Sequence, residues 1–124
     1  MSVKVDLGEL AGALGDFDFA YLITVGADHR AHAIAVQPVL TGGVFDLGVP
    51  GATTTRNLGQ HPGVTLVWPP RKVGGYSLIV DGAGTVGASL TVTPERAVLH
   101  RPAGGAPAGP TGCPHDCVPL ETQP

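Results

Sequence analysis

Three threonines and an arginine stand side by side in the segment 51–58, which has the sequence GATTTRNL. The segment lies between a strand-like stretch and a helix-like stretch. The first N–H groups of a helix, the positive end of its dipole and a guanidinium therefore meet there. Together these groups can bind one phosphate. The alternative is that the threonines only cap the helix while Arg56 lies in solvent, because hydroxyl residues are common before helices. The residues alone leave both interpretations open.

Two histidines lie on either side of Arg30, where a turn passes into a strand. They are His29 and His32. Their spacing does not predict a metal site, because such a site needs further ligands and supporting hydrogen bonds. His61 precedes Pro62 at an expected helix end, where an imidazole complements the helix dipole, so we predict a structural role for it.

Two adjacent basic residues and two large aromatic residues each have two possible roles. Arg71 and Lys72 lie in the sequence PPRKVGG, which predicts an exposed loop. The two cations are either simply solvated or border a groove that receives an acidic substrate. Trp68 and Tyr76 could line a cofactor ring or a substrate pocket. Because bulky rings mostly serve burial, we predict ordinary core or interface roles for both.

The elements that must position these residues are short. The chain has 19 Gly and 12 Pro residues, which punctuate it as in all-β proteins. A first helix is predicted from Asp6, an N-cap residue followed three positions later by Glu9. A second helix begins around Thr54 or Thr55 and ends before Pro62. Six strands are predicted over residues 19–25, 31–39, 44–47, 64–68, 76–86 and 90–93.

Six antiparallel strands and two short helices predict a mainly β fold. A closed or partly closed barrel is favoured, because closure removes free strand edges. This domain covers residues 1–101. Residues 102–124 are rich in Pro and Gly and are predicted to form a tail outside the barrel.

The tail carries the group CPHDC, in which Cys113, His115 and Cys117 are the only candidate metal ligands. A structural zinc site normally has four ligands, and this is not a standard finger spacing. A disulfide between the cysteines is disfavoured in a reducing compartment. We therefore predict no metal site and prefer a compact turn whose Val118 and Leu120 dock on the barrel or on a partner subunit.

Composition limits the classes of function. The 124 residues are 43% hydrophobic and 14% charged, which suits one folded domain. The formal net charge of −3, with scattered basic residues, argues against a nucleic-acid partner. No apolar run approaches the roughly 18 residues that cross a bilayer, so we expect no membrane partner and a cytoplasmic location. The motifs G-x-S-x-G, H-E-x-x-H and the Walker loop are all absent.

Four stretches in order resemble the pyridoxamine 5′-phosphate oxidase-like family of FMN-binding split barrels. They are YLITV at 21–25, DHRAHAIAV at 28–36, TTRNL at 54–58 with HPGVTL at 61–66, and YSLIVDGAG at 76–84. The most specific piece is the continuous TTTRNLGQHPGVTL. The resemblance implies a six-stranded antiparallel split β-barrel that forms a homodimer, with FMN held at the dimer interface.

The resemblance also assigns roles to individual residues. The phosphate-binding role falls on Thr54, Thr55 and Arg56, and the strand around residues 33–37 lies along the flavin ring. Many members place a second basic residue beside the first. It is absent here, which implies either weaker cofactor binding or a phosphate site completed by Arg30 or by the partner subunit. His32 is a candidate hydrogen-bond partner of the cofactor or substrate. The full set of candidate cofactor-binding residues is Thr53, Thr54, Thr55, Arg56, Asn57, Ala35, Val36, Gln37 and Arg30.

Three functions follow, in order of preference. The first is an FMN-dependent oxidoreductase acting on a small molecule, because a flavin carries the hydride itself and needs no protein nucleophile. The second keeps the fold and replaces FMN with the deazaflavin F420. Its acidic oligoglutamate tail favours a basic groove, which is hard to build from seven Lys and Arg residues. The third is a non-catalytic protein that stores or senses a flavin or haem.

Overall fold

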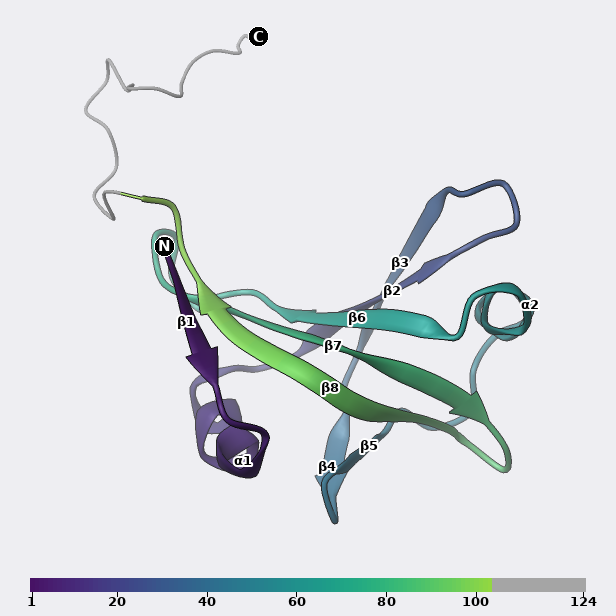
Figure 1. Ribbon diagram of the computed structural model, residues 1–124, viewed down its shortest axis with the longest axis horizontal. Helices are drawn as coiled ribbons and strands as arrows, with labels where there is room; N and C mark the ends of the chain where they lie inside the picture. The colour runs from purple at the N-terminus through teal and green to yellow at the C-terminus, as the bar shows by residue number, and fades with distance from the viewer. Residues whose placement is uncertain (104–124) are drawn as a thin grey trace, which may run out of the picture.

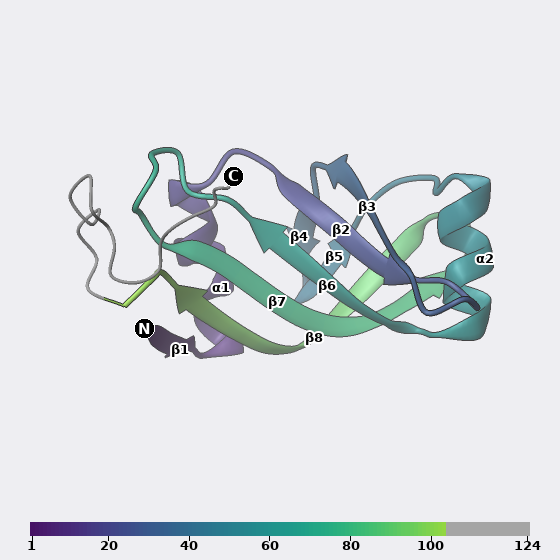
Figure 2. The same ribbon diagram turned by 90° about the horizontal axis from the view of Figure 1, so that it is seen from above.

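The computed structural model describes residues 1–103 and shows a small antiparallel barrel with a helical segment at each end (Figures 1 and 2). The strands are β1 (Ser2–Val5), β2 (Ala20–Val25), β3 (Ala31–Val36), β4 (Val39–Thr41), β5 (Val44–Asp46), β6 (Gly63–Trp68), β7 (Ser77–Val86) and β8 (Leu90–His100). The helices are α1 (Leu10–Ala13), flanked by the 3-10 turns η1 (Leu7–Glu9) and η2 (Leu14–Asp16), and α2 (Ala52–Gln60). None of these helices has the length and apolarity needed to span a bilayer.

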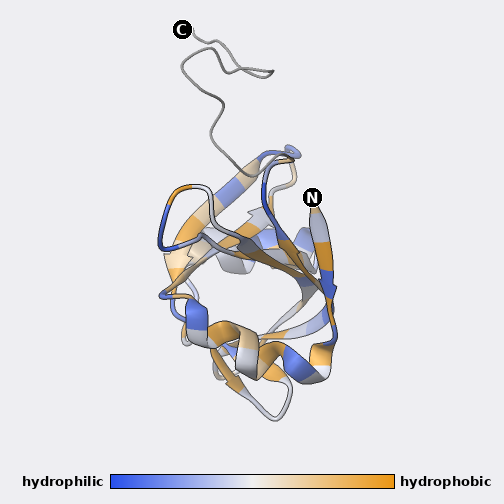
Figure 3. Cartoon of the chain, turned by 90° about the vertical axis from the view of Figure 1, so that its left-hand side faces the viewer, coloured by the Kyte–Doolittle hydropathy of each residue, from blue (hydrophilic) through white to orange (hydrophobic). Residues whose placement is uncertain are grey.

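The barrel closes through one interrupted strand. Neighbouring strands follow the order β3-β2-β6-β7-β8-β5-β4, and every pair is antiparallel. β3 and β4 lie at the two ends of this order, yet only Gln37 and Pro38 separate them in the chain. They are therefore two halves of one barrel strand, the first paired with β2 and the second with β5. Figure 3 shows the resulting ring of strands.

The predicted fold class is confirmed, and the difference between six and eight strands has simple causes. Pro38 has no N–H group and interrupts the predicted strand 31–39, which becomes β3 and β4. β1 was not predicted; it pairs with the end of β8, where Ser2 lies opposite His100. β8 itself continues past its predicted end at Thr93 to His100.

The first helical segment differs from its prediction at the cap. The Asp6 side chain makes no capping hydrogen bond; the Asp6 carbonyl instead accepts from the Glu9 N–H at 2.8 Å. The segment is split into three short turns, as expected where glycines weaken a helix. It is anchored by Leu10, whose side chain is buried in the core. The predicted cap by the Asp6 side chain is therefore wrong, while the predicted first helix is present in this segment.

The core fills the barrel and extends to α2. The rings of Phe45 and Trp68 pack at 5.3 Å between centroids in its centre. Leu58 of α2 belongs to the same cluster. Each buried side chain of this size contributes about 1.5–3 kcal/mol. The helix is thereby fixed to the end of the barrel. The other buried apolar residues are Val5, Leu10, Ala20, Leu22, Val64, Leu66, Leu78, Val80, Leu90, Val92 and Ala97.

Candidate functional site

The N-terminal end of α2 is open and has no cap. Its N-cap residue, Gly51, has an extended backbone and carries no side chain that could cap the first turn. The first turn carries no acidic residue. The helix starts at Ala52, two residues before the earliest predicted start. The N–H groups of its first turn and the positive end of the dipole are therefore available to an anion.

The three threonines have different surroundings. Thr54 is 1% exposed and packs inward. The Thr55 hydroxyl donates to the Gly51 carbonyl at 2.9 Å, so its proton is already used. Thr53 is partly buried and Arg56 is exposed. Because residues three apart share a helix face, Thr53 and Arg56 lie on one face of α2, in its N-terminal half.

Asn57 anchors α2 to the barrel. It is 5% exposed, and its Nδ2 donates to the Oγ1 of Thr24 at 3.1 Å. Thr24 lies on β2 and is fully buried. Gly26, two residues after Thr24, also lies against Asn57. A Cβ at position 26 would lie 3.2 Å from Asn57 Oδ1. Asn57, which the resemblance places among the cofactor-binding residues, is thus held inside the protein and fixes the helix position.

His32 lies next to this buried pair. It stands opposite Thr24 across the β2–β3 ladder, on the partly buried face of β3. Its Nδ1 is buried and has no hydrogen-bond partner among the described residues. An unpaired buried ring nitrogen is unusual in native proteins. This imidazole was predicted as a hydrogen-bond partner of a cofactor or substrate, and its free Nδ1 is compatible with that role.

The outer face of β3 presents small side chains. Ala31, Ala33 and Ala35 alternate along the exposed face. Tyr21, 42% exposed, lies opposite Ala35, and the partly buried Ile23 lies opposite Ala33. We call these five residues the alanine platform. Because the alanine side chains are short, a planar ring can approach the backbone of β3.

The far end of β3 borders a cavity. Ala35, Val36 and Gln37 line an open cavity of about 350 Å³ together with Asp18 and Phe19. The other end of β3 lies at Thr24, the residue bonded to α2. At about 3.3 Å per residue, the six steps from residue 31 to residue 37 span roughly 20 Å. Ala35, Val36 and Gln37 therefore lie at the opposite end of β3 from the ladder position that Asn57 of α2 contacts, and only an elongated molecule reaches both.

Arg30 lies beside the other end of α2. Its turn contacts the helix at the C-cap residue, where the rings of His29 and His61 lie 5.8 Å apart. Arg30 itself has a side chain that is 87% exposed, and its Nε lies 3.8 Å from Asp28 Oδ2. Thr53 and Arg56 lie three residues apart on α2, whereas Arg30 lies near the C-terminal end of the helix.

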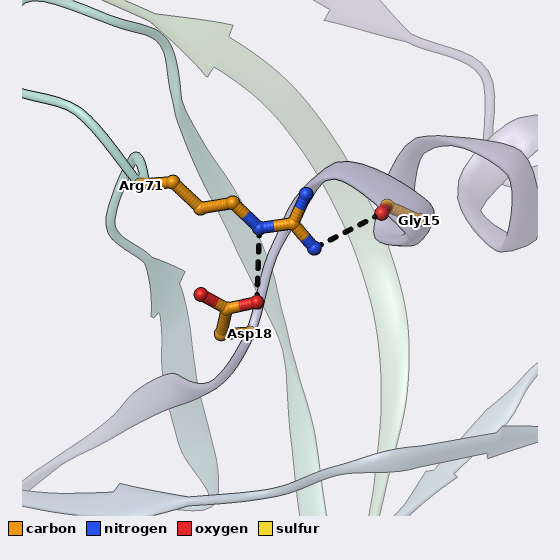
Figure 4. Close-up of polar contacts among 3 residues, drawn as sticks. All are labelled: Gly15, Asp18 and Arg71. Atoms are coloured by element: carbon orange, nitrogen blue, oxygen red, sulfur yellow. Dashed lines mark hydrogen bonds and ion pairs between the residues drawn. The ribbon is translucent and has the colours of Figure 1, made fainter.

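A second cavity lies at the predicted basic loop, for which a groove that receives an acidic substrate was one of the two predicted roles. It has a volume of about 290 Å³ and is bordered by Arg71 and Lys72 of the predicted loop. Figure 4 shows Arg71 held at two points. Its Nε donates to Asp18 Oδ1 at 2.9 Å, and its Nη2 donates to the Gly15 carbonyl at 3.3 Å. The sequence identified the basic loop, but no local pattern indicates a partner more than fifty residues away.

Metal ligands do not cluster in the described part of the chain. No group of three His, Cys, Asp or Glu side chains in residues 1–103 is placed to hold a metal ion. The predicted turn with Cys113, His115 and Cys117, and the whole predicted tail beyond residue 103, lie outside the described residues.

Two known proteins are similar to this chain in sequence. No family model matches the chain. Two uncharacterised proteins, from Mycobacterium bovis and Mycobacterium tuberculosis, are each 49% identical to it over 93% of this chain and 94% of their own length.

Solved structures share the fold at low sequence identity. A candidate pyridoxamine 5′-phosphate oxidase of Listeria innocua has a TM-score of 0.63 at 13% identity, covering 75% of this chain and 96% of that one. An FAD-binding protein of Mycobacterium smegmatis has a TM-score of 0.57 at 16% identity, covering 80% and 97%. An F420 reductase has a TM-score of 0.50 at 14% identity, covering 71% and 88%. This chain therefore belongs to the same family as the two mycobacterial proteins, and its barrel is a split barrel of the pyridoxamine 5′-phosphate oxidase-like type.

Proposed function

We propose that this protein binds FMN and acts as an oxidoreductase on a small molecule. The observation that carries the proposal is the open N-terminal end of α2, with Thr53 and Arg56 on one face of the helix, in a split barrel whose structural neighbours include an FAD-binding protein. The first-turn N–H groups, the Thr53 hydroxyl and the Arg56 guanidinium hold the phosphate. All three are donors, as a phosphate requires.

The remaining residues fit the rest of an elongated flavin. The alanine platform receives the flat ring, and the backbone of residues 35–37 borders the ring at the far end of β3. FMN supplies hydride transfer when bound, while the chain binds and orients it.

A second copy of the chain is part of the proposal. The alanine platform is continuous with further apolar residues on the outer face of the sheet, because Val67 pairs with Tyr21 and Ile79 pairs with Val67. Covering this face in a homodimer removes apolar surface from water and closes the ring-binding side. Sedimentation equilibrium is expected to show a dimer, and a monomer at micromolar concentration would contradict this part of the proposal.

The phosphate site is tested by matched ligands and matched variants. Full-length protein is titrated with FMN and with riboflavin, which lacks the phosphate, by following flavin fluorescence. Wild-type protein is expected to bind FMN more tightly than riboflavin. Arg56→Gln removes one charge-assisted contact, so it should weaken FMN about ten-fold and leave riboflavin unchanged.

The control variant is Arg96→Gln, which removes an exposed cation paired with Asp81 on another part of the sheet. It should bind both ligands as the wild type does. Equal affinities for FMN and riboflavin, or an Arg56→Gln variant that binds FMN normally, would contradict the phosphate site. No binding of either ligand would contradict the flavin assignment.

F420 is the second candidate cofactor, because the same fold occurs in an F420 reductase. Its acidic tail calls for several cations along its path. Close to α2 the described cations are Arg56 on the helix and Arg30 at the helix's opposite end, so FMN ranks first. A titration with F420 beside FMN decides between them, since F420 binding without FMN binding would reverse this order.

A further inference from the structure

The cavity beside the β6–β7 loop has the features of a binding pocket. Its volume is about 290 Å³, and it lies between the segment before β2 and the loop between β6 and β7. Its walls include the apolar side chains Phe17, Tyr76 and Leu99. Small-molecule pockets typically begin at roughly 300 Å³ and are lined mainly by such groups. The space therefore suits a ligand with a small ring system.

Arg71 is held at the mouth of this cavity with donors to spare. A guanidinium has five N–H donors, of which one is given to Asp18 and one to Gly15. Three remain, and the two contacts restrict where they can be placed (Figure 4). Lys72 follows directly and also borders the cavity. A fixed guanidinium beside a flexible ammonium favours a carboxylate at the mouth.

Arg101 adds a third cation at the same place. Its guanidinium carbon lies 4.6 Å from the centre of the Tyr76 ring, and Tyr76 lines the cavity. Its Nε is buried and has no hydrogen-bond partner among the described residues. Two of the seven basic residues of an acidic chain thus line the cavity, and a third stacks on one of its wall residues. Asp16 is the one acidic residue in the lining of this cavity, and no ion pair is described for it. Asp18, outside this lining, pairs with Arg71.

We propose that this cavity binds a small molecule that combines a flat ring with a carboxylate. The ring lies against Phe17, Tyr76 and Leu99, and the carboxylate meets Arg71 and Lys72. Asp18, which holds Arg71, also lines the cavity at the end of β3. The two cavities therefore lie on either side of one ion pair. If the bound carboxylate is the substrate of the oxidoreductase, this assignment rests on the proposed function. Binding of the carboxylate in the cavity requires no cofactor.

The experiment compares two probes that differ only in charge. Full-length ¹⁵N-labelled protein is titrated with 2-naphthoate and with the neutral 2-naphthamide, and amide chemical shifts are followed. Naphthoate is expected to bind about five-fold more tightly, the modest gain appropriate to cations that are partly exposed. The largest shifts should fall on Ala13, Gly75 and Leu99, which line the cavity.

Two variants and one control sharpen this test. Lys72→Gln should reduce the preference for naphthoate, and Arg71→Gln with Lys72→Gln should abolish it. Lys4→Gln makes the same charge change on β1, away from the cavity, and should keep the preference. Equal affinity for the two probes, or shifts confined to other parts of the barrel, would overturn the proposal. A failed FMN titration leaves this result unaffected, so the two proposals fail separately.

Discussion

The variant Gly82→Ala is expected to lose about 3 kcal/mol of its free energy of unfolding, the upper end of the usual cost of overpacking a core. Gly82 is buried in β7, where the pairing with β8 shifts register. A Cβ at this position would collide with the carbonyl oxygen of Thr93 and lie 3.1 Å from Val92 Cγ1. The first obstacle is backbone, which cannot rotate away as a side chain does. The two longest strands must therefore separate locally.

Urea denaturation followed by far-UV circular dichroism measures this loss. The matched control is Gly63→Ala, because Gly63 also lies in a strand and a Cβ there meets no atom within 4 Å. The control should change stability by no more than about 1 kcal/mol. If both variants unfold at the same urea concentration, the close approach of β7 and β8 at Gly82 is not as described.

Replacing Asn57 with leucine is expected to cost about 2–3 kcal/mol, because the variant removes one partner of a buried hydrogen bond. Leucine has a similar size, so the loss is mainly polar. The Thr24 hydroxyl would remain fully buried with its donor gone. The same variant loosens α2, so FMN affinity should fall even though the Asn57 side chain is buried.

A double-mutant cycle with Thr24→Val isolates the contact. If the hydrogen bond is the cause, the double variant should be more stable than the sum of the single losses predicts, by about 1 kcal/mol or more. Gln60→Leu is the control, since Gln60 is exposed on the same helix and should change stability by less than about 0.5 kcal/mol. Strict additivity of the two buried substitutions would contradict the anchoring role of Asn57.

Much of the barrel follows from sequence patterns, and its departures have physical causes. Runs rich in β-branched and other large apolar residues mark β2, β6 and β7 close to their observed bounds. The end of β8 was missed because Pro94 normally excludes a central strand. Here Pro94 lies opposite Gly82, Arg96 lies opposite Asp81, and Glu95 is the extra residue between them. A bulge accommodates the proline, and its position depends on the partner strand.

The candidate site was only partly predictable for the same reason. Once α2 is known to start at Ala52, helical spacing puts Thr54, Asn57 and Leu58 on one face and Thr53 and Arg56 on another. The sequence signal was therefore present, but it depended on the start of the helix. The contacts of Asn57 with Thr24 and of Arg71 with Asp18 join distant segments, and no local pattern indicates them.

The interruption of the barrel strand at Pro38 has a consequence for how copies of this chain meet. β3 pairs with β2 alone and β4 with β5 alone, so each keeps one unpaired side among the described residues. An uninterrupted strand would offer one long template for intermolecular β-pairing and fibrillar stacking. Because Pro38 has no N–H group, a strand from another copy of the chain can pair only with the short edges of β3 and β4. The same kink that closes the barrel thus protects the protein against aggregation at high concentration.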